Sequence, residues 1–366
     1  MDRIFLSPPH MSGKEQQYIS EVFESNYIAP LGAFVNRFEE TIRDYTSVKY
    51  SLALSSATAG LHLALKVLGV EKDDYVLASS FTFIGSVNAI LYQNAKPIFV
   101  DSDESWNISP TLLKKAIKEA PKKPKALIIT HLYGQLCKLD EIVTICKEEG
   151  ICLIEDAAES LGASYAGKQS GSMGDMAVYS FNGNKILTTS GGGMLVSDNE
   201  GWIEKAKFLS TQAKEDFLHY EHKEVGYNYR MSNVLAAIGV AQMEVLSQRV
   251  KRRREIFDLY KEQLLDVEEI IFMPEIERSK GNRWLTTLLL KKTNPQNIID
   301  ALEKENIESR PLWKPMHMQA LFEDAIVVED GTSQRLFEQG ICLPSGSSMS
   351  DDDVYRVCEN VKKVLT

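Results

Sequence analysis

The sequence predicts an α/β protein built around a mostly parallel β-sheet that helices cover on both faces. Short and almost continuously apolar runs alternate along the first half of the chain with amphipathic helical patterns. The apolar runs, which we expect to be buried strands, are residues 75–78, 97–100, 126–129 and 151–154; two of the helical patterns cover residues 111–119 and 139–149.

Polar or aromatic segments directly follow three of these predicted strands. They are residues 81–83, residues 131–134 and Asp156. Because parallel strands end at the same edge of a sheet, and ligands bind beyond that edge, we expect these segments to converge on a binding site.

The second half of the chain predicts a smaller α+β domain. A length of 366 residues is enough for two domains. A long helical stretch over residues 233–265 connects them, and after Asp266 the pattern predicts a strand at 284–290, a helix at 295–306 and a final helix at 351–364 capped by Ser350. We place the large domain at residues 1–245 and the small domain, with its connecting helix, at 246–366.

The charge distribution argues against two classes of partner. The net charge is −10, so neither nucleic acid nor an anionic membrane is expected as the main partner, although a local basic cluster can still bind an anionic small molecule. Residues 251–254, Lys-Arg-Arg-Arg, are interpreted as the solvated face of an amphipathic helix.

Cysteine usage and the amino terminus favour a cytoplasmic location. The five cysteines form no CxxC pair and mostly lie in apolar runs, as expected of reduced core residues. No run of eighteen apolar residues predicts a transmembrane helix, and residues 1–11 do not resemble a signal peptide.

Lys185 lies between two predicted strands, in a segment rich in hydroxyl, amide and glycine residues. Residues 176–179 lead into this segment, SFNGNK occupies 180–185, and three glycines at 191–193 precede the apolar run 194–196. A lysine whose amine must meet a carbonyl cofactor in a shaped pocket needs such surroundings, whereas a surface lysine does not. The alternative is an ordinary loop lysine.

Asp156 ends a predicted buried strand and is the second residue, after Lys185, that suggests a bound cofactor. A partly buried carboxylate needs a partner, and a protonated pyridine nitrogen is a suitable one. A lysine and a strand-end aspartate together suggest pyridoxal 5'-phosphate (PLP), with Lys185 holding it as a Schiff base and moving protons, and Asp156 pairing with the ring nitrogen. The alternative is a helix-capping aspartate.

Residues 55–60, SSATAG, form a candidate phosphate site. Small hydroxyl residues at the start of a helix present free N–H groups and a partial positive charge, although the same pattern also marks a simple cap. No GxxxxGK[ST] or GxGxxG pattern supports ATP or a dinucleotide.

Phe83 is a candidate for stacking on the cofactor ring, or else a core aromatic. His219 and His222 have no third ligand at suitable spacing, so no metal is expected.

These motifs together resemble the DegT-type nucleotide-sugar aminotransferases, which are fold type I PLP enzymes. The resemblance spans most of the chain and rests on SATA at 56–59, TF at 82–83, EDAAE at 155–159, SFNGNK at 180–185, GYNYR at 226–230 and SRP at 309–311. It implies a large domain with a mostly parallel seven-stranded sheet flanked by helices, and a smaller C-terminal domain.

The resemblance also implies roles for individual residues. Lys185 and Asp156 would be catalytic, and Glu159 would lie near the ring hydroxyl. Ser56, Ala57, Thr58 and Ser180 would belong to the phosphate site, and Phe83 would stack on the ring. Asn228 would reach the phosphate of a neighbouring subunit, which implies a homodimer with shared active sites.

Within the family the chain is most similar to the bacterial enzymes that aminate UDP-4-keto-6-deoxy-N-acetylglucosamine on the route to diacetamidobacillosamine. This similarity lies in SNYIAPLG at 25–32, NGNK at 182–185, SGGG at 190–193 and RPLWK at 310–314. The family often has Gly-Glu-Gly-Gly where this chain has SGGG, which weakens a generic substrate assignment but agrees with this subgroup. A dehydrating branch replaces the lysine by histidine, so Lys185 favours transamination.

The implied reaction has two halves, with L-glutamate as donor and pyridoxamine phosphate as the intermediate form of the cofactor. The keto sugar then receives the amino group at C4. Candidate substrate-binding residues are Tyr27, Arg230, Arg310, Trp313, Lys314 and His317. The arginines suit a pyrophosphate but equally suit structural ion pairs, and the large aromatics equally suit packing.

Three alternatives remain open from the sequence. One is a different PLP enzyme, such as a lyase or an amino-acid aminotransferase. The second is a nucleotide-sugar enzyme that forms a 3-amino or an axial 4-amino product. The third is a non-catalytic PLP-binding or regulatory protein, which the retention of Lys185 and Asp156 disfavours.

Overall fold

A computed structural model describes residues 2–365, and its largest element is an eight-stranded sheet with the order β1-β9-β8-β5-β4-β2-β3-β14. The strands are β1 (Tyr50–Leu54), β2 (Tyr75–Ser79), β3 (Lys96–Val100), β4 (Ala126–Thr130), β5 (Cys152–Asp156), β8 (Met176–Ser180), β9 (Gly193–Ser197) and β14 (Ile326–Val328). Every neighbouring pair is parallel except the two that include β9. The predicted α/β class with a mostly parallel sheet is confirmed.

The sheet has one strand more than the seven that the family resemblance implied. The additional strand is β14, which comes from the C-terminal part of the chain and pairs in parallel with β3, Ile326 opposite Ile98. Its three residues are too short to give a recognisable strand pattern, and only the tertiary fold brings them to this edge.

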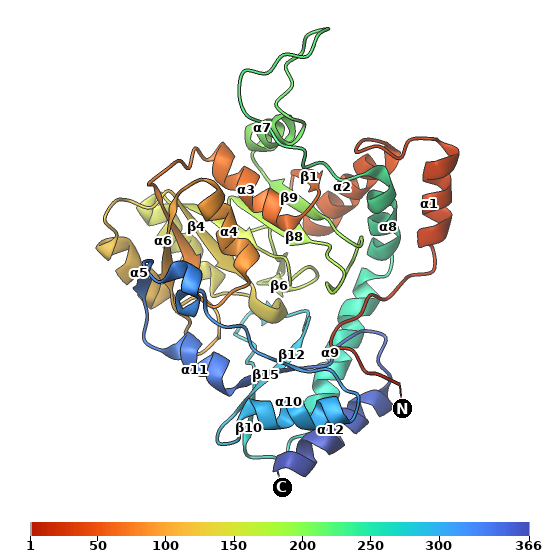
Figure 1. Ribbon diagram of the computed structural model, residues 1–366, viewed down its shortest axis with the longest axis vertical. Helices are drawn as coiled ribbons and strands as arrows, with labels where there is room; N and C mark the ends of the chain where they lie inside the picture. Colours follow the sequence, from red (N-terminus) through yellow and green to blue (C-terminus); the bar gives the residue numbers. More distant parts are fainter. Residues whose placement is uncertain (1, 366) are drawn as a thin grey trace.

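Helices cover both faces of the sheet, as the apolar strands require (Figure 1). Alternate residues of a strand point to opposite faces: Val76 and Ala78 pack with α3 (Ala57–Val67), α4 (Ile84–Tyr92) and α7 (Glu200–Ser210). Leu77 faces the other side, which α5 (Pro110–Glu119) and α6 (Leu139–Glu149) cover. A third cluster packs α1 (Glu15–Glu24), α2 (Ala33–Thr46) and α8 (Asn233–Met243) against β8 and β9.

A second, antiparallel sheet lies below the first in Figure 1, with both chain termini on that side. Its order is β10-β12-β15-β13, and it packs on α9, α10 and α12 around a separate apolar core. Its elements are α9 (Leu246–Gln263), β10 (Ile270–Phe272), β12 (Thr286–Leu290), α10 (Pro295–Lys304), β13 (Arg310–Pro311), β15 (Gly340–Leu343) and α12 (Asp351–Leu365). Ser350 Oγ accepts a hydrogen bond from Asp353 N, as expected of the α12 cap.

The division at residue 245 remains a prediction, since β14 returns from the C-terminal part to the large sheet. Met1 and Thr366, the outer limits of the two proposed domains, lie outside the described residues. Smaller elements complete the chain: β11 (Ser279–Lys280), β6 (Ser164–Tyr165) and β7 (Lys168–Gln169) form a three-stranded sheet, and η1 (Leu132–Gly134), η2 (Met316–Met318), η3 (Ala320–Phe322) and α11 (Thr332–Gln339) are short helices.

The connecting helical stretch differs from the sequence prediction in two ways. It consists of two helices, α8 and α9, separated at Glu244 and Val245. The interpretation of residues 251–254 as a solvated face is wrong for Arg253, which is only 1 % exposed, although Lys251 is exposed as expected. The guanidinium is buried because it faces the Trp284 carbonyl and the Ser7 hydroxyl, both of which accept hydrogen bonds from it.

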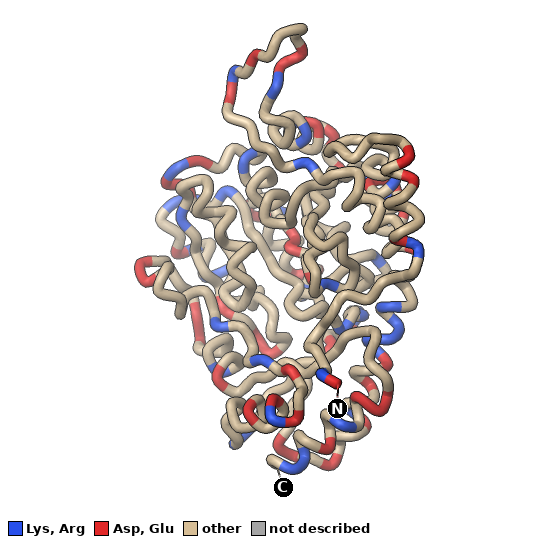
Figure 2. Tube along the Cα trace, turned by 45° about the vertical axis from the view of Figure 1, so that its right-hand side comes forward, with Lys and Arg blue, Asp and Glu red and all other residues tan. Residues whose placement is uncertain are grey.

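Acidic and basic residues are interspersed over the outer helices and loops in the view of Figure 2. The loop after α7 projects from the body as a long arm over residues 212–228 (Figure 1). It exposes the apolar side chains of Phe217, Leu218, Tyr220 and Val225. Among residues 2–365, no helix has the length and apolar character needed to cross a bilayer.

Candidate active site

A cavity of about 300 Å³ opens at the carboxyl ends of β4, β5 and β8, where the sequence predicted that functional segments converge. Eight of the nine predicted cofactor residues line it, namely Ser56, Ala57, Thr58, Phe83, Asp156, Glu159, Ser180 and Lys185. The structure therefore brings these side chains to one place, although they come from four separate segments of the chain.

Lys185 extends into this cavity from the turn between β8 and β9. Its side chain is 11 % exposed, and its Nζ lies 3.4 Å from Glu159 Oε1. The ammonium also lies 4.1 Å from the centroid of the Trp284 indole, a cation–π contact. The amine is thus held between a carboxylate and an aromatic face and shielded from bulk water.

The glycines after Lys185 allow β9 to start directly against α3. A Cβ on Gly193 would lie 2.3 Å from Ala57 N and 2.4 Å from the Ser56 carbonyl carbon. Gly192 has a φ of +154°, which an L side chain rarely adopts. The glycine run therefore brings the lysine turn against the first turn of the helix that carries the candidate phosphate site.

Asp156 is the last residue of β5 and is buried. Ser86 Oγ donates a hydrogen bond of 2.5 Å to its Oδ2, and Ala158 N donates one of 3.0 Å to its Oδ1. Ser86 belongs to a chain of buried hydroxyls that continues to Thr82 and Thr130. These donors fix the orientation of the carboxylate group at the end of β5.

Glu159 lies beneath the lysine and is almost fully buried. Burial raises the pKa of this carboxyl group to about 7, against the opposing effect of the Lys185 charge. Its Oε2 accepts a hydrogen bond of 2.6 Å from the backbone N–H of Tyr133, which has a left-handed φ of 51°. The Glu159 carboxyl group can therefore gain or lose a proton near neutral pH, directly beside the amine.

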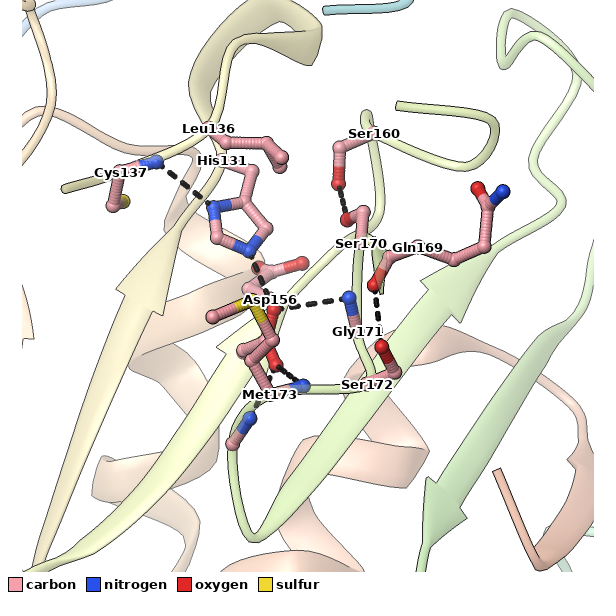
Figure 3. A network of polar contacts seen from close by, with 12 residues as sticks. His131, Leu136, Cys137, Asp156, Ser160, Gln169, Ser170, Gly171, Ser172 and Met173 are labelled. Carbon is pink, nitrogen blue, oxygen red and sulfur yellow. Dashed lines mark hydrogen bonds and ion pairs between the residues drawn. The ribbon is translucent and has the colours of Figure 1, made fainter. Parts of the chain in front are cut away.

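A second buried acid lies behind Asp156 and holds this end of β5. Glu155 accepts hydrogen bonds from the backbone amides of residues 171, 173 and 174 and from His131 Nε2 at 2.8 Å. Although burial alone would raise the pKa of Glu155, these donors lower it below its usual value. His131 Nδ1 accepts from Cys137 N, so the ring proton resides on Nε2 (Figure 3). The network ties the loop after β7 to β5.

The N-terminus of α3 forms the opposite end of the cavity. Ser56 Oγ accepts a hydrogen bond of 3.0 Å from Ala59 N, which is the cap that the sequence offered as an alternative. Ser56 itself, Ala57 and Thr58 also line the cavity, so the cap and an anion site coexist here. A helix N-terminus, a recessed amine and a buried anionic carboxylate around one cavity match the phosphate, aldehyde and pyridinium of PLP, so the residues fit this cofactor.

Aromatic side chains form the wall over the lysine. The Phe83 and Trp313 ring centroids are 5.4 Å apart, and Trp313 lies 5.2 Å from Tyr133. Trp284 completes the cluster and lines the cavity. Sequence reasoning did not identify Trp284, since it appeared only as the start of a predicted strand about a hundred residues after Lys185.

The turn at Gly134, next to Tyr133 of this aromatic cluster, packs closely against Asn282, which is distant in the sequence. A Cβ on Gly134 would lie 1.8 Å from Asn282 Oδ1, and Gly134 has a φ of +87°. The same Asn282 donates to the backbone oxygen of Glu159 and accepts from Trp284 N. The sequence signal that could have pointed to this contact is the Asn-Arg-Trp cluster of residues 282–284, at the start of a predicted strand.

Most of the predicted substrate residues lie outside the described cavity. Trp313 lines it, whereas Tyr27 is exposed, and so are Lys314 and Arg310, the latter paired with Glu308. Arg230, with its side chain 8 % exposed, forms an ion pair with Glu39 at 3.0 Å, which corresponds to the structural alternative. His317 contacts Ser80 Oγ at 2.5 Å and Glu329 at 3.1 Å.

Asn228, the ninth predicted cofactor residue, is exposed at the base of the projecting arm and does not line the cavity of its own chain. Its backbone pairs with Thr211 across that base. This position agrees with a role toward a second copy and does not test it.

Comparisons with known proteins identify relatives over nearly the whole chain. The model of the DegT/DnrJ/EryC1/StrS aminotransferase family matches residues 9–362. EpsN of Bacillus subtilis (strain 168), which carries the assignment of a pyridoxal phosphate-dependent aminotransferase, is 54 % identical over 98 % of this chain and 94 % of its own. GDP-perosamine synthase of Escherichia coli O157:H7 is 34 % identical over 99 % of both chains. The aminotransferase TlmJ of Streptoalloteichus hindustanus superposes with a TM-score of 0.93 and 26 % identity, over 99 % of this chain and 98 % of its own.

Proposed function

The chain belongs to the DegT/DnrJ/EryC1/StrS aminotransferase family, and on this basis we propose that it transfers the amino group of L-glutamate to C4 of a UDP-linked 4-keto-6-deoxy-N-acetylhexosamine. It is a PLP-dependent sugar aminotransferase. The single observation that carries the proposal is the convergence of Lys185, Asp156 and Glu159 with the α3 N-terminus around one cavity.

The cavity residues divide into those that hold the cofactor and those that move protons. Bound PLP supplies a carbonyl for the incoming amine and an electron sink for the carbon that loses its proton. Lys185 would hold it covalently, and Asp156, held in place by Ser86 and Ala158, would keep its ring nitrogen protonated. The first turn of α3 and Ser180 would bind its phosphate.

Lys185 is the group that would carry protons to and from the reacting carbon. Once free, its amine is confined by Glu159 on one side and the Trp284 ring on the other, which limits the positions that Nζ can reach. Glu159, with a pKa of about 7, can take up the proton that the amine must lose to act as a base.

The aromatic wall suits the sugar half of the substrate. Phe83 is exposed and Trp313 is half-buried, and both line the cavity, which favours stacking on the cofactor or on a hexose or uracil ring. Lys314 and Arg310 lie exposed next to Trp313 in sequence and can supply charge for a pyrophosphate in this acidic protein.

A homodimer forms part of the proposal. The arm over residues 212–228 exposes four large apolar side chains, more than an isolated surface loop requires. Packing of this arm on a second copy would bury them and carry Asn228 toward the other active site. Free cysteines throughout the described chain favour a reducing compartment, in keeping with a cytoplasmic enzyme.

The choice of nucleotide is the sharpest test of the substrate. Motifs at residues 25–32 and 310–314 support a UDP-N-acetyl sugar, whereas the relative at 34 % identity is a GDP-perosamine synthase and favours a GDP-linked acceptor. The purified enzyme, PLP and L-glutamate should be incubated with UDP-4-keto-6-deoxy-N-acetylglucosamine or with a GDP-4-keto-6-deoxyhexose, and the products identified by mass and NMR. We expect turnover with the UDP sugar and an equatorial 4-amino product. Turnover with the GDP sugar alone, or a 3-amino or axial product, would contradict the assignment.

Attachment of the cofactor to Lys185 can be tested separately. Borohydride reduction of the holoenzyme should fix PLP to the peptide that contains Lys185, and Lys185→Ala should lose both the label and turnover. A label on another lysine would overturn the proposed site without touching the question of the sugar.

A further inference from the structure

Two segments far from Lys185 in sequence hold the peptide that precedes it. Ser7 Oγ donates a hydrogen bond of 2.7 Å to the carbonyl oxygen of Asn184, and Trp284 Nε1 donates one of 2.8 Å to the same oxygen. Both lone pairs of this carbonyl are therefore in use. The backbone immediately before the lysine is fixed from two sides, by the N-terminal segment and by the segment that enters β12.

Arg253 of α9 links these two donors. Its Nη2 donates to Ser7 Oγ at 2.9 Å, and its Nη1 donates to the backbone oxygen of Trp284. A guanidinium can only donate, so the Ser7 hydroxyl must accept from Arg253 and direct its own proton to Asn184. The direction of the whole chain of hydrogen bonds is thus set by Arg253.

The burial of Arg253 is not explained by packing alone. The side chain is 1 % exposed, and its Nε atom has no hydrogen-bond partner within residues 2–365. Burial lowers the pKa of the guanidinium to about 9, which leaves it charged at neutral pH. Burying a cation whose only acceptors are neutral oxygens is unfavourable, and an apolar side chain of similar length would avoid this cost.

We infer that Arg253 is a positioning residue for amino transfer, which acts through Ser7 and Trp284 to aim the amine of Lys185. Arg253 holds the backbone of Trp284 through its carbonyl oxygen, and the Nε1 of the Trp284 indole is bonded to Asn184. The centroid of the indole ring lies 4.1 Å from Lys185 Nζ, so Arg253 is linked both to the ring that faces the amine and, through Ser7, to the backbone before the lysine. The inference rests on the proposed role of Lys185.

The test compares Arg253→Met and Ser7→Ala with the matched control Lys251→Met in holoenzyme. Lys251 lies two residues earlier on the same helix, is exposed and pairs only with Glu255 among the described residues. The first readout is the pH midpoint of the absorbance band of the lysine–cofactor linkage. The second is the rate of the half-reaction with L-glutamate alone, which does not depend on the identity of the sugar.

Both variants should shift the midpoint by about half a unit or more and slow the half-reaction about ten- to a hundredfold, since a displacement near 1 Å has effects of this size. The concentration of glutamate at half-maximal rate should change less than about threefold, because donor binding is not the affected step. Lys251→Met should behave as wild type. Arg253→Lys should not restore the rate, because a single ammonium group cannot replace the two guanidinium nitrogens that donate to the two acceptors.

Wild-type midpoints and rates in both variants would overturn the inference, even if their thermal stability were lower. If Arg253→Met does not fold, Ser7→Ala decides by the same two readouts. Borohydride labelling distinguishes a failure of this inference from a failure of the proposed function. Label on Lys185 in the wild type, together with unaffected variants, removes only the role of Arg253, whereas absence of that label removes the proposed function as well.

Discussion

Lys185 Nζ lies 3.4 Å from Glu159 Oε1, and the two side chains are only 11 % and 2 % exposed. In most soluble proteins such a pair is solvated and contributes little. Here burial raises the pKa of the Glu159 carboxyl group to about 7, so its charge changes near neutral pH. This change of charge takes place directly beside the amine of Lys185.

The first prediction concerns the pH dependence of stability. The pKa of Glu159 rises from 4.5 to about 7 on folding, so the folded state binds the proton more tightly than the unfolded chain between these values. The free energy of unfolding must then fall as pH rises through this window, by about 3 kcal/mol for this group. Glu159→Gln removes this effect. The free energy of unfolding of the variant, relative to that of the wild type, should therefore rise by about the same amount between pH 4.5 and pH 8.

Urea unfolding of the cofactor-free protein at both pH values measures this difference, because contributions from all other groups cancel between the two proteins. Glu303→Gln, which alters a surface carboxylate paired with Arg3, serves as the control and should show no such change. A difference between Glu159→Gln and wild type that stays constant with pH would contradict the assigned shift.

The sequence predicted the parts of this site that lie at strand ends and in local motifs. Asp156 and Ser180 end buried strands, and the start of α3 follows β1 closely. Such positions can be predicted because the apolar period locates the strand and parallel strands end at one edge. Within the cavity, the positions of Lys185 and Glu159 follow from the same local segments.

The remaining parts depend on how distant segments dock, which no local pattern encodes. Ser86 reaches Asp156 only because α4 packs across the end of β5, and Trp284 reaches Lys185 only because the second sheet sits below the cavity. Arg253 was expected on a solvated face because basic runs in amphipathic helices are usually exposed to solvent. Tertiary contacts instead bury its side chain. Arg230 and Arg310, the arginines predicted for the substrate, lie outside the described cavity, and their role toward the substrate stays a prediction.

The second prediction isolates the charge of Asp156. Asp156→Asn keeps the shape of the side chain and its contact with Ser86 but cannot keep a ring nitrogen protonated. Turnover should fall about a hundredfold or more, in line with the loss of one fixed charge opposite a developing charge in a buried site. Steady-state kinetics with saturating L-glutamate and sugar measure the effect.

A cofactor analogue provides the matched control for Asp156→Asn. PLP methylated at the ring nitrogen carries a permanent positive charge and does not need the carboxylate for protonation. Reconstitution of the variant with this analogue should recover a large part of the lost rate. Failure to recover, with normal binding of the analogue, would assign Asp156 a purely structural role.

The third prediction concerns the junction between the lysine turn and the phosphate end of the cavity. Gly193→Ala would place a Cβ 2.3 Å from Ala57 N, a backbone atom that cannot move alone. We expect a loss of about 2–3 kcal/mol in the free energy of unfolding and weaker binding of PLP, because the first turn of α3 must shift. Gly183→Ala, where nothing lies within 4 Å of the added Cβ and the residue does not line the cavity, is the control. Equal stability and equal PLP affinity in both variants would contradict this packing.

The fourth prediction decides between the two roles considered for Arg230. Its Nη1 lies 3.0 Å from Glu39 Oε1 and 2.9 Å from the Ala53 carbonyl oxygen, and its side chain is 8 % exposed. Removing one partner of a buried pair leaves an uncompensated charge, so Arg230→Met should lose about 3 kcal/mol or more of stability. Because Nη1 already donates to these two protein acceptors and Arg230 does not line the cavity, the KM for the nucleotide sugar should change less than about twofold.

Glu39 allows the cause to be identified by a double-mutant cycle. If the ion pair accounts for the loss, Arg230→Met in a Glu39→Gln background should cost far less than in the wild type, because no carboxylate is then left without its cation. Denaturant unfolding gives the coupling energy, and initial rates over a range of sugar concentrations give the KM. A tenfold rise in KM with unchanged stability would instead return Arg230 to the pyrophosphate site, since only contact with the substrate could produce that pattern.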